Sequence, residues 1–203
     1  MVLSETDVFP ALPEVTGGVV ADPTLALVDG TYHMWFSSFG CGDGDTCADI
    51  RTFGVSHATS TDAINWTPDP ANPVVFGAEQ PSVLWNAQDC QFEMWFARDA
   101  EGEEDAVPST FNPSLGTFRA TSQDGSTWTV DESRDFVWDG TEAGEDLGLL
   151  TGVDVAQRGR ERVLFYVGMG THQVPDGHFI PVQTSHNSDG FVPGVFGLGL
   201  AMQ

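Results

Sequence analysis

The chain has 203 residues, 40% of them hydrophobic and 18% charged, a composition that is ordinary for a globular domain and argues against disorder. Its 30 acidic residues face seven basic ones, all arginine, and the formal net charge of −23 argues against nucleic acid or an anionic membrane as a partner. We also expect no membrane insertion, because no segment is apolar over the 18 or so residues of a spanning helix and the N-terminal residues lack the pattern of a secretion signal.

The first repeating unit covers about residues 18–75 and is predicted to form four short strands. ADPTLALV and TYHMWFSS flank a turn at Asp29 and Gly30, FGVSHATS follows a loop, and INWT follows a turn near Asp62. Aspartate–glycine turns between aromatic and β-branched runs are strong hairpin signals. Asp62, and Asp124 in the next unit, are therefore interpreted as hairpin residues.

The loop GCGDGDTCADI joins the second and third of these strands and holds two of the three cysteines, Cys41 and Cys47. A disulfide that closes this loop is one interpretation, and it implies an oxidising compartment, extracellular or periplasmic. Cys90 would then be free or paired outside the chain. The alternative is three reduced thiols without a role.

The same loop carries Asp43, Asp45 and Asp49, closely spaced oxygen ligands of the kind that calcium prefers. The spacing differs from that of an EF-hand. A calcium ion is one possibility here, and an acidic loop without an ion is the other. No motif indicates an organic cofactor.

A second unit, about residues 76–138, repeats the first. FEMWFAR starts at Phe92, 60 positions after YHMWFSS starts at Tyr32, and Trp128 follows Trp66 by 62 positions. Two anchors at nearly equal spacing indicate an internal repeat.

A third unit, about residues 147–203, contains GVDVAQRGRERVLFYVGMG and reaches GLGLAMQ, which matches the GVSHATS strand of the first unit. We expect this unit to be incomplete, without its last strand.

Four antiparallel strands repeated at this period are typical of the blades of a β-propeller, so we predict an all-β fold in a single domain or fragment. A ring of five such blades would need about 300 residues at roughly 60 per blade. If the ring has five blades, about three of them are visible in this chain. We expect open blade edges, which indicate missing chain or self-association.

The runs DPTLALVDGTYHMWFSS, ATSTDAINWT and NPVV resemble a blade of the five-bladed propeller glycoside hydrolases, the arabinanase, xylosidase, levansucrase and invertase-like enzymes. The resemblance covers most of residues 18–203. It implies a carbohydrate substrate and hydrolysis by paired carboxyl groups, held roughly 5 to 9.5 Å apart.

The resemblance also implies where those carboxyl groups are. The family places a base or nucleophile at an Asp-Pro in the first blade, which Asp22 and Pro23 match. Aligning Pro81 with Pro23 puts Gln80 opposite Asp22, so Glu79 would act from one residue earlier. In the third blade the family's general-acid glutamate has no match, because Thr151 and Gly152 occupy its place. The candidates are Asp154 just beyond, or Glu142 and Glu145 upstream, and the general acid is unassigned.

Arg98 and His172, which we expect just past the second strands of their blades, are candidates for contacts to sugar hydroxyls. The alternative function is a non-catalytic, secreted or surface propeller that binds glycans or proteins through its long loops. The missing glutamate in the third blade favours that alternative.

Overall fold

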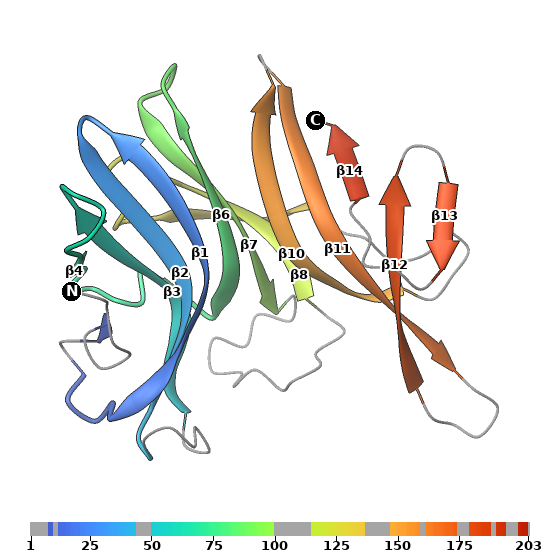
Figure 1. Ribbon diagram of the computed structural model, residues 1–203, viewed down its shortest axis with the longest axis horizontal. Coiled ribbons are helices and arrows are strands. Elements are labelled where there is room, and N and C mark those ends of the chain that lie inside the picture. The colour runs from blue at the N-terminus through green and yellow to red at the C-terminus, as the bar shows by residue number, and fades with distance from the viewer. Residues whose placement is uncertain are drawn as a thin grey trace.

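The computed structural model describes residues 8–9, 12–43, 50–99, 115–136, 147–158, 161–173, 179–187, 190–193 and 199–202, and the side chains of residues 8–9, 12–43, 50–98, 117–132 and 154–157. The strands form three antiparallel sheets that lie side by side (Figure 1). The predicted all-β architecture of antiparallel blades is confirmed. In the part of the chain that the structure describes, no helix is long and apolar enough to cross a membrane.

Blade 1 is the first sheet, with the strand order β1-β2-β3-β4 and β5 also paired with β3. The turn between β1 and β2 is formed by Asp29 and Gly30, whose φ angles of 49° and 81° suit a tight hairpin of two residues. The hairpin predicted from the Asp-Gly pair is therefore present. The strands are β1 (Gly17–Val28), β2 (Thr31–Cys41), β3 (Ile50–Ser60), β4 (Thr67–Pro68) and β5 (Val75–Phe76).

Blade 2 has the order β6-β7-β8-β9 and repeats the register of blade 1. Trp95 lies opposite Ser82 and Arg119, as Trp35 lies opposite Thr24 and His57. The 60-residue repeat is thus a repeat of strand pairing as well as of sequence. The strands are β6 (Ala78–Asn86), β7 (Gln91–Asp99), β8 (Leu115–Ser122) and β9 (Thr129–Phe136).

Blade 3 has the order β10-β11-β12-β13, and a further strand, β14, pairs with β11. Leu200 of β14 lies opposite Phe165, the same register that His57 has with Trp35 in blade 1. Residues 199–202 of the segment GLGLAMQ therefore take the place predicted from GVSHATS, while β12 pairs with the other half of β11 and β13 pairs with β12. The strands are β10 (Leu147–Arg158), β11 (Glu161–Gln173), β12 (Phe179–Asn187), β13 (Gly190–Pro193) and β14 (Gly199–Met202).

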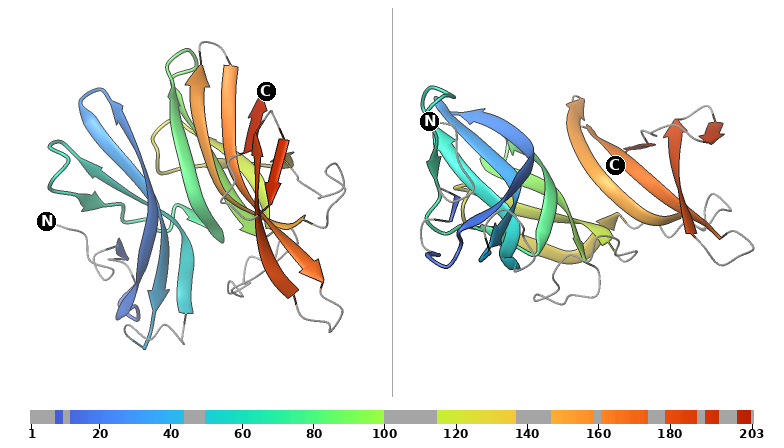
Figure 2. Two further views of the ribbon diagram at one scale, coloured as in Figure 1. Left: turned by 45° about the vertical axis from the view of Figure 1, so that its right-hand side comes forward. Right: turned by 60° about the horizontal axis from the view of Figure 1, so that its bottom comes forward.

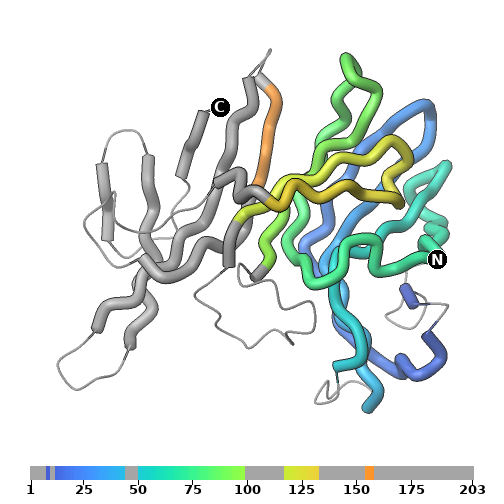
Figure 3. Tube along the Cα trace, turned by 180° about the vertical axis from the view of Figure 1, so that it is seen from behind, coloured from blue at the N-terminus to red at the C-terminus, as the bar shows by residue number. Residues whose placement is uncertain are grey.

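The first strands of the blades are neighbours: β6 contacts both β1 and β10. The turned views keep the sheets in the order of the chain (Figure 2), and the view from behind shows blades 1 and 2 side by side (Figure 3). One hydrogen bond recurs between these inner strands. The Val83 N–H donates to Thr24 Oγ1 over 3.3 Å, and the Val155 N–H donates to Ser82 Oγ over 2.9 Å.

The main core lies between blades 1 and 2. Trp35 and Val55 of blade 1 pack against Phe92, Met94 and Phe96 of blade 2, all of them buried. Side chains on a strand alternate between its two faces, so these residues are the facing sides of the two sheets. Each fully buried side chain of this size contributes about 1.5–3 kcal/mol to folding.

The opposite side of blade 1 is covered by the segment that precedes β1. Phe36 and Ala58 pack there against Val8, Phe9 and Val15. In blade 2 the residue at the position of Phe36 is Phe96, which packs against blade 1. The N-terminal segment therefore takes, for blade 1, the place that a preceding blade takes for blade 2.

This cover does not extend over the whole of that side. Leu25 and Leu27 in the inner strand β1 are 59% and 57% exposed. Val83, at the register of Leu25, is 4% exposed against blade 1. The inner strand β1 therefore presents exposed apolar side chains at a register that is buried in β6.

Candidate functional site

All three inner strands carry a β-bulge at the same register. Between the pairs Ala21–Ser37 and Thr24–Trp35, β1 has one residue more than β2, and β6 has the same irregularity between Glu79 and Ser82. In β10 the irregularity falls between Thr151 and Val153. Asp22, Gln80 and Gly152 are thus equivalent residues of the three blades. Bulges re-aim side chains and are frequent next to active sites.

The bulges of β1 and β6 share an unusual backbone conformation. Asp22 and Gln80 have φ angles of 52° and 55°, in the left-handed region that non-glycine residues seldom adopt. Each is followed by a proline, which lacks a ladder donor and is tolerated within sheets at bulges. Such conformations cost about 1–3 kcal/mol each and cluster at functional sites.

A chain of hydrogen bonds connects the two bulges across the boundary between the blades. The Gln80 N–H donates to Ser37 Oγ over 2.7 Å, and the Ser37 hydroxyl donates to Asp22 Oδ2 over 3.1 Å. The Ser37 side chain is buried between the two strands, with 2% of its surface exposed.

Glu79 is the second carboxyl group of this site. Its pKa is raised, first by burial, which disfavours the charged form, and then by the negative charge of Asp22. The electrostatic interaction places the two carboxyl groups within each other's influence. A half-buried glutamate with a raised pKa beside an exposed aspartate is an arrangement suited to acid–base chemistry.

Asp154 occupies a different position in its blade. It lies opposite Phe165, two residues beyond the bulge, at the register of Thr24 and Ser82. Its carboxylate accepts a hydrogen bond of 2.9 Å from Ser82 Oγ. The structure therefore places Asp154 at the contact between β6 and β10 and leaves Gly152 at the third bulge.

The two residues proposed to contact sugar lie inside strands rather than past them. Arg98 in β7 pairs with Glu132 at 2.5 Å and lies over the ring of Phe118, 4.6 Å from its centroid. This pairing directs its guanidinium across blade 2 toward β9. His172 lies in β11 opposite Ile180, and its side chain is outside the described residues.

The proposed calcium loop is described only in part. Asp43 is exposed, while Asp45 and Asp49 lie outside the described residues. Among the residues that are described, no group of three or more histidine, cysteine, aspartate or glutamate side chains could hold a metal ion. Cys41 at the start of this loop is disulfide-bonded, and Cys90 is free and exposed.

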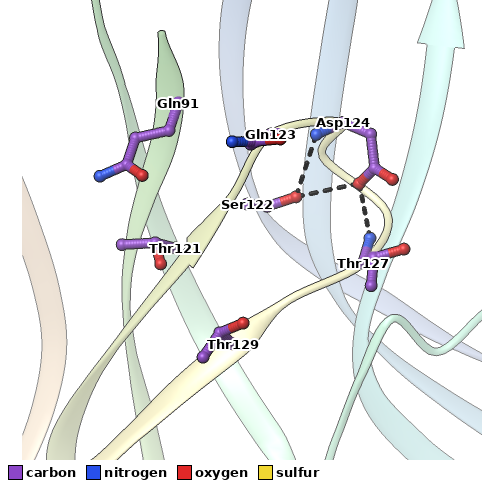
Figure 4. Close-up of a pocket in the computed structure, with 7 residues that line it drawn as sticks. All are labelled: Gln91, Thr121, Ser122, Gln123, Asp124, Thr127 and Thr129. Carbon is purple, nitrogen blue, oxygen red and sulfur yellow. Dashed lines mark hydrogen bonds between the residues drawn. The ribbon is translucent and has the colours of Figure 1, made fainter. Parts of the chain in front are cut away.

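A polar hollow of about 400 Å³ lies at the turn between β8 and β9 (Figure 4). It is built around Asp124, whose Oδ1 accepts the Ser126 and Thr127 N–H groups over 2.9 and 2.7 Å. These bonds lower the pKa of Asp124 to about 2. Asp62 accepts the corresponding bonds in blade 1, so both aspartates act as the hairpin residues predicted from the sequence.

This hollow is remote from the bulges. The hollow lies where β8 ends and β7 begins. This is also where β6 ends, at Asn86, and Glu79 is seven residues before that end. At a rise of roughly 3.3 Å per residue, that is about 23 Å along the strand. The hollow and the carboxyl pair therefore lie at opposite ends of blade 2.

A histidine pair that the sequence did not reveal lies between blades 1 and 2, with His57 buried and His33 half-buried. His33 Nδ1 and His57 Nε2 are 3.1 Å apart with stacked rings, and His57 Nδ1 is 3.1 Å from Asp69 Oδ2. The Ser126 hydroxyl of blade 2 donates to Asp69 over 2.5 Å. Nearby, Trp35 Nε1 donates to the Gly125 carbonyl over 2.8 Å.

In blade 2 the positions of His33 and His57 are occupied by Glu93 and Arg119. These two form an ion pair of 3.1 Å, and Arg119 lies over the ring of Trp95. Both polar pairs belong to the packing of blades, because each flanks the tryptophan of its second strand. Neither lies at the bulges.

No protein-family model matches the chain, and the comparison with curated proteins finds no match. Solved structures do match. A glycosyl hydrolase from Bacteroides ovatus superposes with a TM-score of 0.51 at 12% identity, over 88% of this chain and 60% of that one. The chain thus spans less than two thirds of that enzyme.

Two further enzymes show the same likeness. The GH32 β-fructofuranosidase BmSUC1 of Bombyx mori matches with a TM-score of 0.56 at 12% identity, over 92% of this chain and 38% of that one. Zg3597, a family 117 glycoside hydrolase of Zobellia galactanivorans, matches with a TM-score of 0.54 at 12% identity, over 92% and 73%. The chain therefore shares its fold with glycoside hydrolases, which confirms at the level of fold the resemblance drawn from its blade motifs.

Proposed function

We propose that the protein is a glycosidase-like propeller that hydrolyses glycosidic bonds in oligo- or polysaccharides, with Asp22 and Glu79 as its catalytic carboxyl groups. The observation that carries the proposal is the hydrogen-bonded link between the two bulges, from Asp22 through the Ser37 hydroxyl to the Gln80 N–H, the residue next to Glu79. Asp22 is exposed, while Glu79 is half-buried and has a raised pKa. The shared fold with glycoside hydrolases supports it.

Each group has a distinct role in this proposal. Glu79 holds a proton and donates it to the oxygen of the departing sugar as the bond to the anomeric carbon breaks. Asp22 is charged and either removes a proton from the attacking water or attacks the anomeric carbon itself. In the first course Asp22 ends with the proton of the water and Glu79 without one, and exchange with solvent returns a proton to Glu79. In the second course water displaces Asp22 from the glycosyl intermediate while Glu79 takes the proton of that water. In both courses water supplies the hydroxyl group that ends on the anomeric carbon.

The test is release of reducing ends from arabinan, xylan, fructan and mannan oligosaccharides. We expect turnover that falls by at least 10³-fold in Asp22→Asn and in Glu79→Gln, because each removes one of two groups that act together. Asp154→Asn is the matched control, because Asp154 is a third inner-strand carboxylate and lies outside the bulges. Unchanged turnover in Asp22→Asn would rule the assignment out.

The alternative is a non-catalytic propeller that binds glycans or proteins. One observation favours it: the third bulge carries Gly152 and thus no carboxyl group. Calorimetry that shows heat of sugar binding, with no reducing ends released by the same protein, would support this alternative. Bond cleavage that depends on Asp22 would exclude it.

An extracellular or periplasmic location belongs to the same proposal. The disulfide at Cys41 supports it, because disulfides persist in oxidising compartments. A calcium ion at Asp43, Asp45 and Asp49 is likewise a proposal. It predicts that chelation lowers the melting temperature and that added calcium restores it.

A further inference from the structure

The hydroxyl of Ser37 is fixed in direction by its partners. Its oxygen accepts the Gln80 N–H, which can only donate, and its own proton is therefore free to point at Asp22 Oδ2. The side chain is 2% exposed, so water does not compete for either bond. Ser37 thus joins the bulge that carries Asp22 to the backbone next to Glu79.

The hydroxyl is particular to blade 1. Ser37 lies opposite Ala21, and the residues at the same register of the other blades are Ala97, opposite Glu79, and Val167, opposite Thr151. Alanine and valine satisfy the strand pairing at this register equally well. The packing of a blade therefore does not require a hydroxyl here, and the one that is present serves the bulge with the aspartate.

We infer that Ser37 is a positioning residue of the proposed site: it holds the Asp22 carboxylate toward Glu79 and keeps the two bulges in register. This inference rests on the proposed function. A carboxylate side chain rotates about two bonds, and the hydrogen bond from Ser37 restrains that rotation. Restraint of this kind keeps reacting groups in their productive geometry.

The titration of Glu79 reports the position of Asp22, because the charge of Asp22 contributes to the raised pKa of Glu79. We would follow the Glu79 carboxyl carbon by NMR as the pH is changed. In Asp22→Asn the pKa of Glu79 should fall. In Ser37→Ala it should fall in the same direction by a smaller amount, since the released aspartate turns away, and in Ser37→Thr, which keeps the hydroxyl, it should stay at the wild-type value.

Ser38→Ala is the matched control. Ser38 is also buried, and its hydroxyl bonds to the Gly54 carbonyl and to Ser56 within blade 1. Its removal costs a comparable hydrogen bond without touching the bulges, so the titration of Glu79 should not move. A general loosening of blade 1 would instead move it in both alanine variants.

The outcomes separate the two proposals. If Asp22→Asn lowers the pKa of Glu79 and Ser37→Ala does not, Ser37 is not a positioning residue and the carboxyl pair stands. If Asp22→Asn leaves the pKa unchanged, the pair itself fails and the proposed function with it. In turnover assays Ser37→Ala should lower kcat about tenfold with KM nearly unchanged, and Ser37→Thr should recover most of the loss.

Discussion

Blades 1 and 2 have the same register at every anchor and yet differ in the chemistry of their polar contacts. Each places a buried tryptophan in its second strand, Trp35 or Trp95. Beside Trp35 lie two imidazoles, His33 and His57. At the corresponding positions beside Trp95 lies an ion pair, formed by Glu93 and Arg119.

The difference shows which part of a blade is fixed by the fold. The apolar residues and the tryptophan define the packing and recur. The two polar residues beside the tryptophan hydrogen-bond to each other, and both differ between the blades. Replacing only one of them would leave its partner as a buried polar group without a hydrogen bond. The predictions below test this view from the largest expected effect to the smallest.

The largest effect should come from removing the cation in blade 2. Arg119→Met leaves Glu93, whose side chain is 3% exposed, without its ion-pair partner, and should destabilise the protein by about 2–4 kcal/mol in chemical unfolding. Arg98→Met is the control, because its partner Glu132 is 71% exposed and is hydrated when unpaired. That variant should stay within about 1 kcal/mol of the wild type. Equal losses of stability in the two variants would show that the burial of the acidic partner does not determine the cost.

The next effect concerns the contact between the blades at Gly125. A Cβ there would lie 2.9 Å from Trp35 Cζ2 and 3.3 Å from His33 Nδ1. Gly30 has the same φ of +81° with no atom within 4 Å, so Gly30→Ala measures the backbone cost alone. Gly125→Ala should be less stable than Gly30→Ala by about 1–3 kcal/mol, the cost of overpacking. Two equally stable variants would show that the blades separate easily at this point.

A smaller effect should distinguish Leu25 from Val83, which share one register. Val83→Ala removes two methyl groups from the core and should cost about 2 kcal/mol. Leu25→Ala removes apolar surface that is 59% exposed and should change the free energy of unfolding by less than about 0.5 kcal/mol. A large loss in Leu25→Ala would instead reveal that this edge of β1 is covered in solution.

The smallest effect should be the pH dependence of the histidine pair. Burial lowers the pKa of both His33 and His57 from 6.5. The charge of His57 lowers the pKa of His33 further, and at His57 burial outweighs the opposing effect of the Asp69 and Asp124 carboxylates. Because the unfolded chain binds more protons, the stabilisation is complete above pH 6.5 and is lost as the pH falls through 6.5 toward the lowered values.

The free energy of unfolding should therefore decline between about pH 7 and pH 5. His33→Phe keeps an aromatic ring and removes one titrating group, so its decline over this range should be shallower. Arg98→Met, a variant in blade 2 that leaves both histidines in place, should keep the wild-type slope and so confirm that the slope comes from blade 1. Identical slopes in wild type and His33→Phe would exclude the pair as its source.

The sequence predicted the fold well because blades are built from local signals. The turn at Asp29, the aspartates of the Asp62 and Asp124 turns and the placement of GLGLAMQ beside β11 all follow from short patterns and from the repeat. The equivalence of Asp22 with Gln80 also followed from aligning the prolines. Their common bulge is what that alignment reflects.

The sequence was less informative about contacts between blades. Ser37 is one polar residue in an aromatic strand, and its role depends on where the backbone of the next blade comes to lie. The contact of Asp154 in blade 3 with Ser82 in blade 2 spans 72 positions. Within blade 2, the partner of Arg98 is Glu132, 34 positions away. One signal could have pointed to Ser37. When β1 and β2 are paired, Ser37 lies opposite Ala21, the residue just before Asp22 and Pro23.

The segment before β1 bears on the order in which the protein is made. Val8, Phe9 and Val15 leave the ribosome before the strands that they cover. The outer side of blade 1 can therefore be shielded as soon as β2 and β3 form. The side of blade 1 that holds Trp35 stays uncovered until Phe92 and Phe96 have been synthesised. During that interval the nascent protein exposes its largest apolar surface, and this is when a chaperone would bind it most readily.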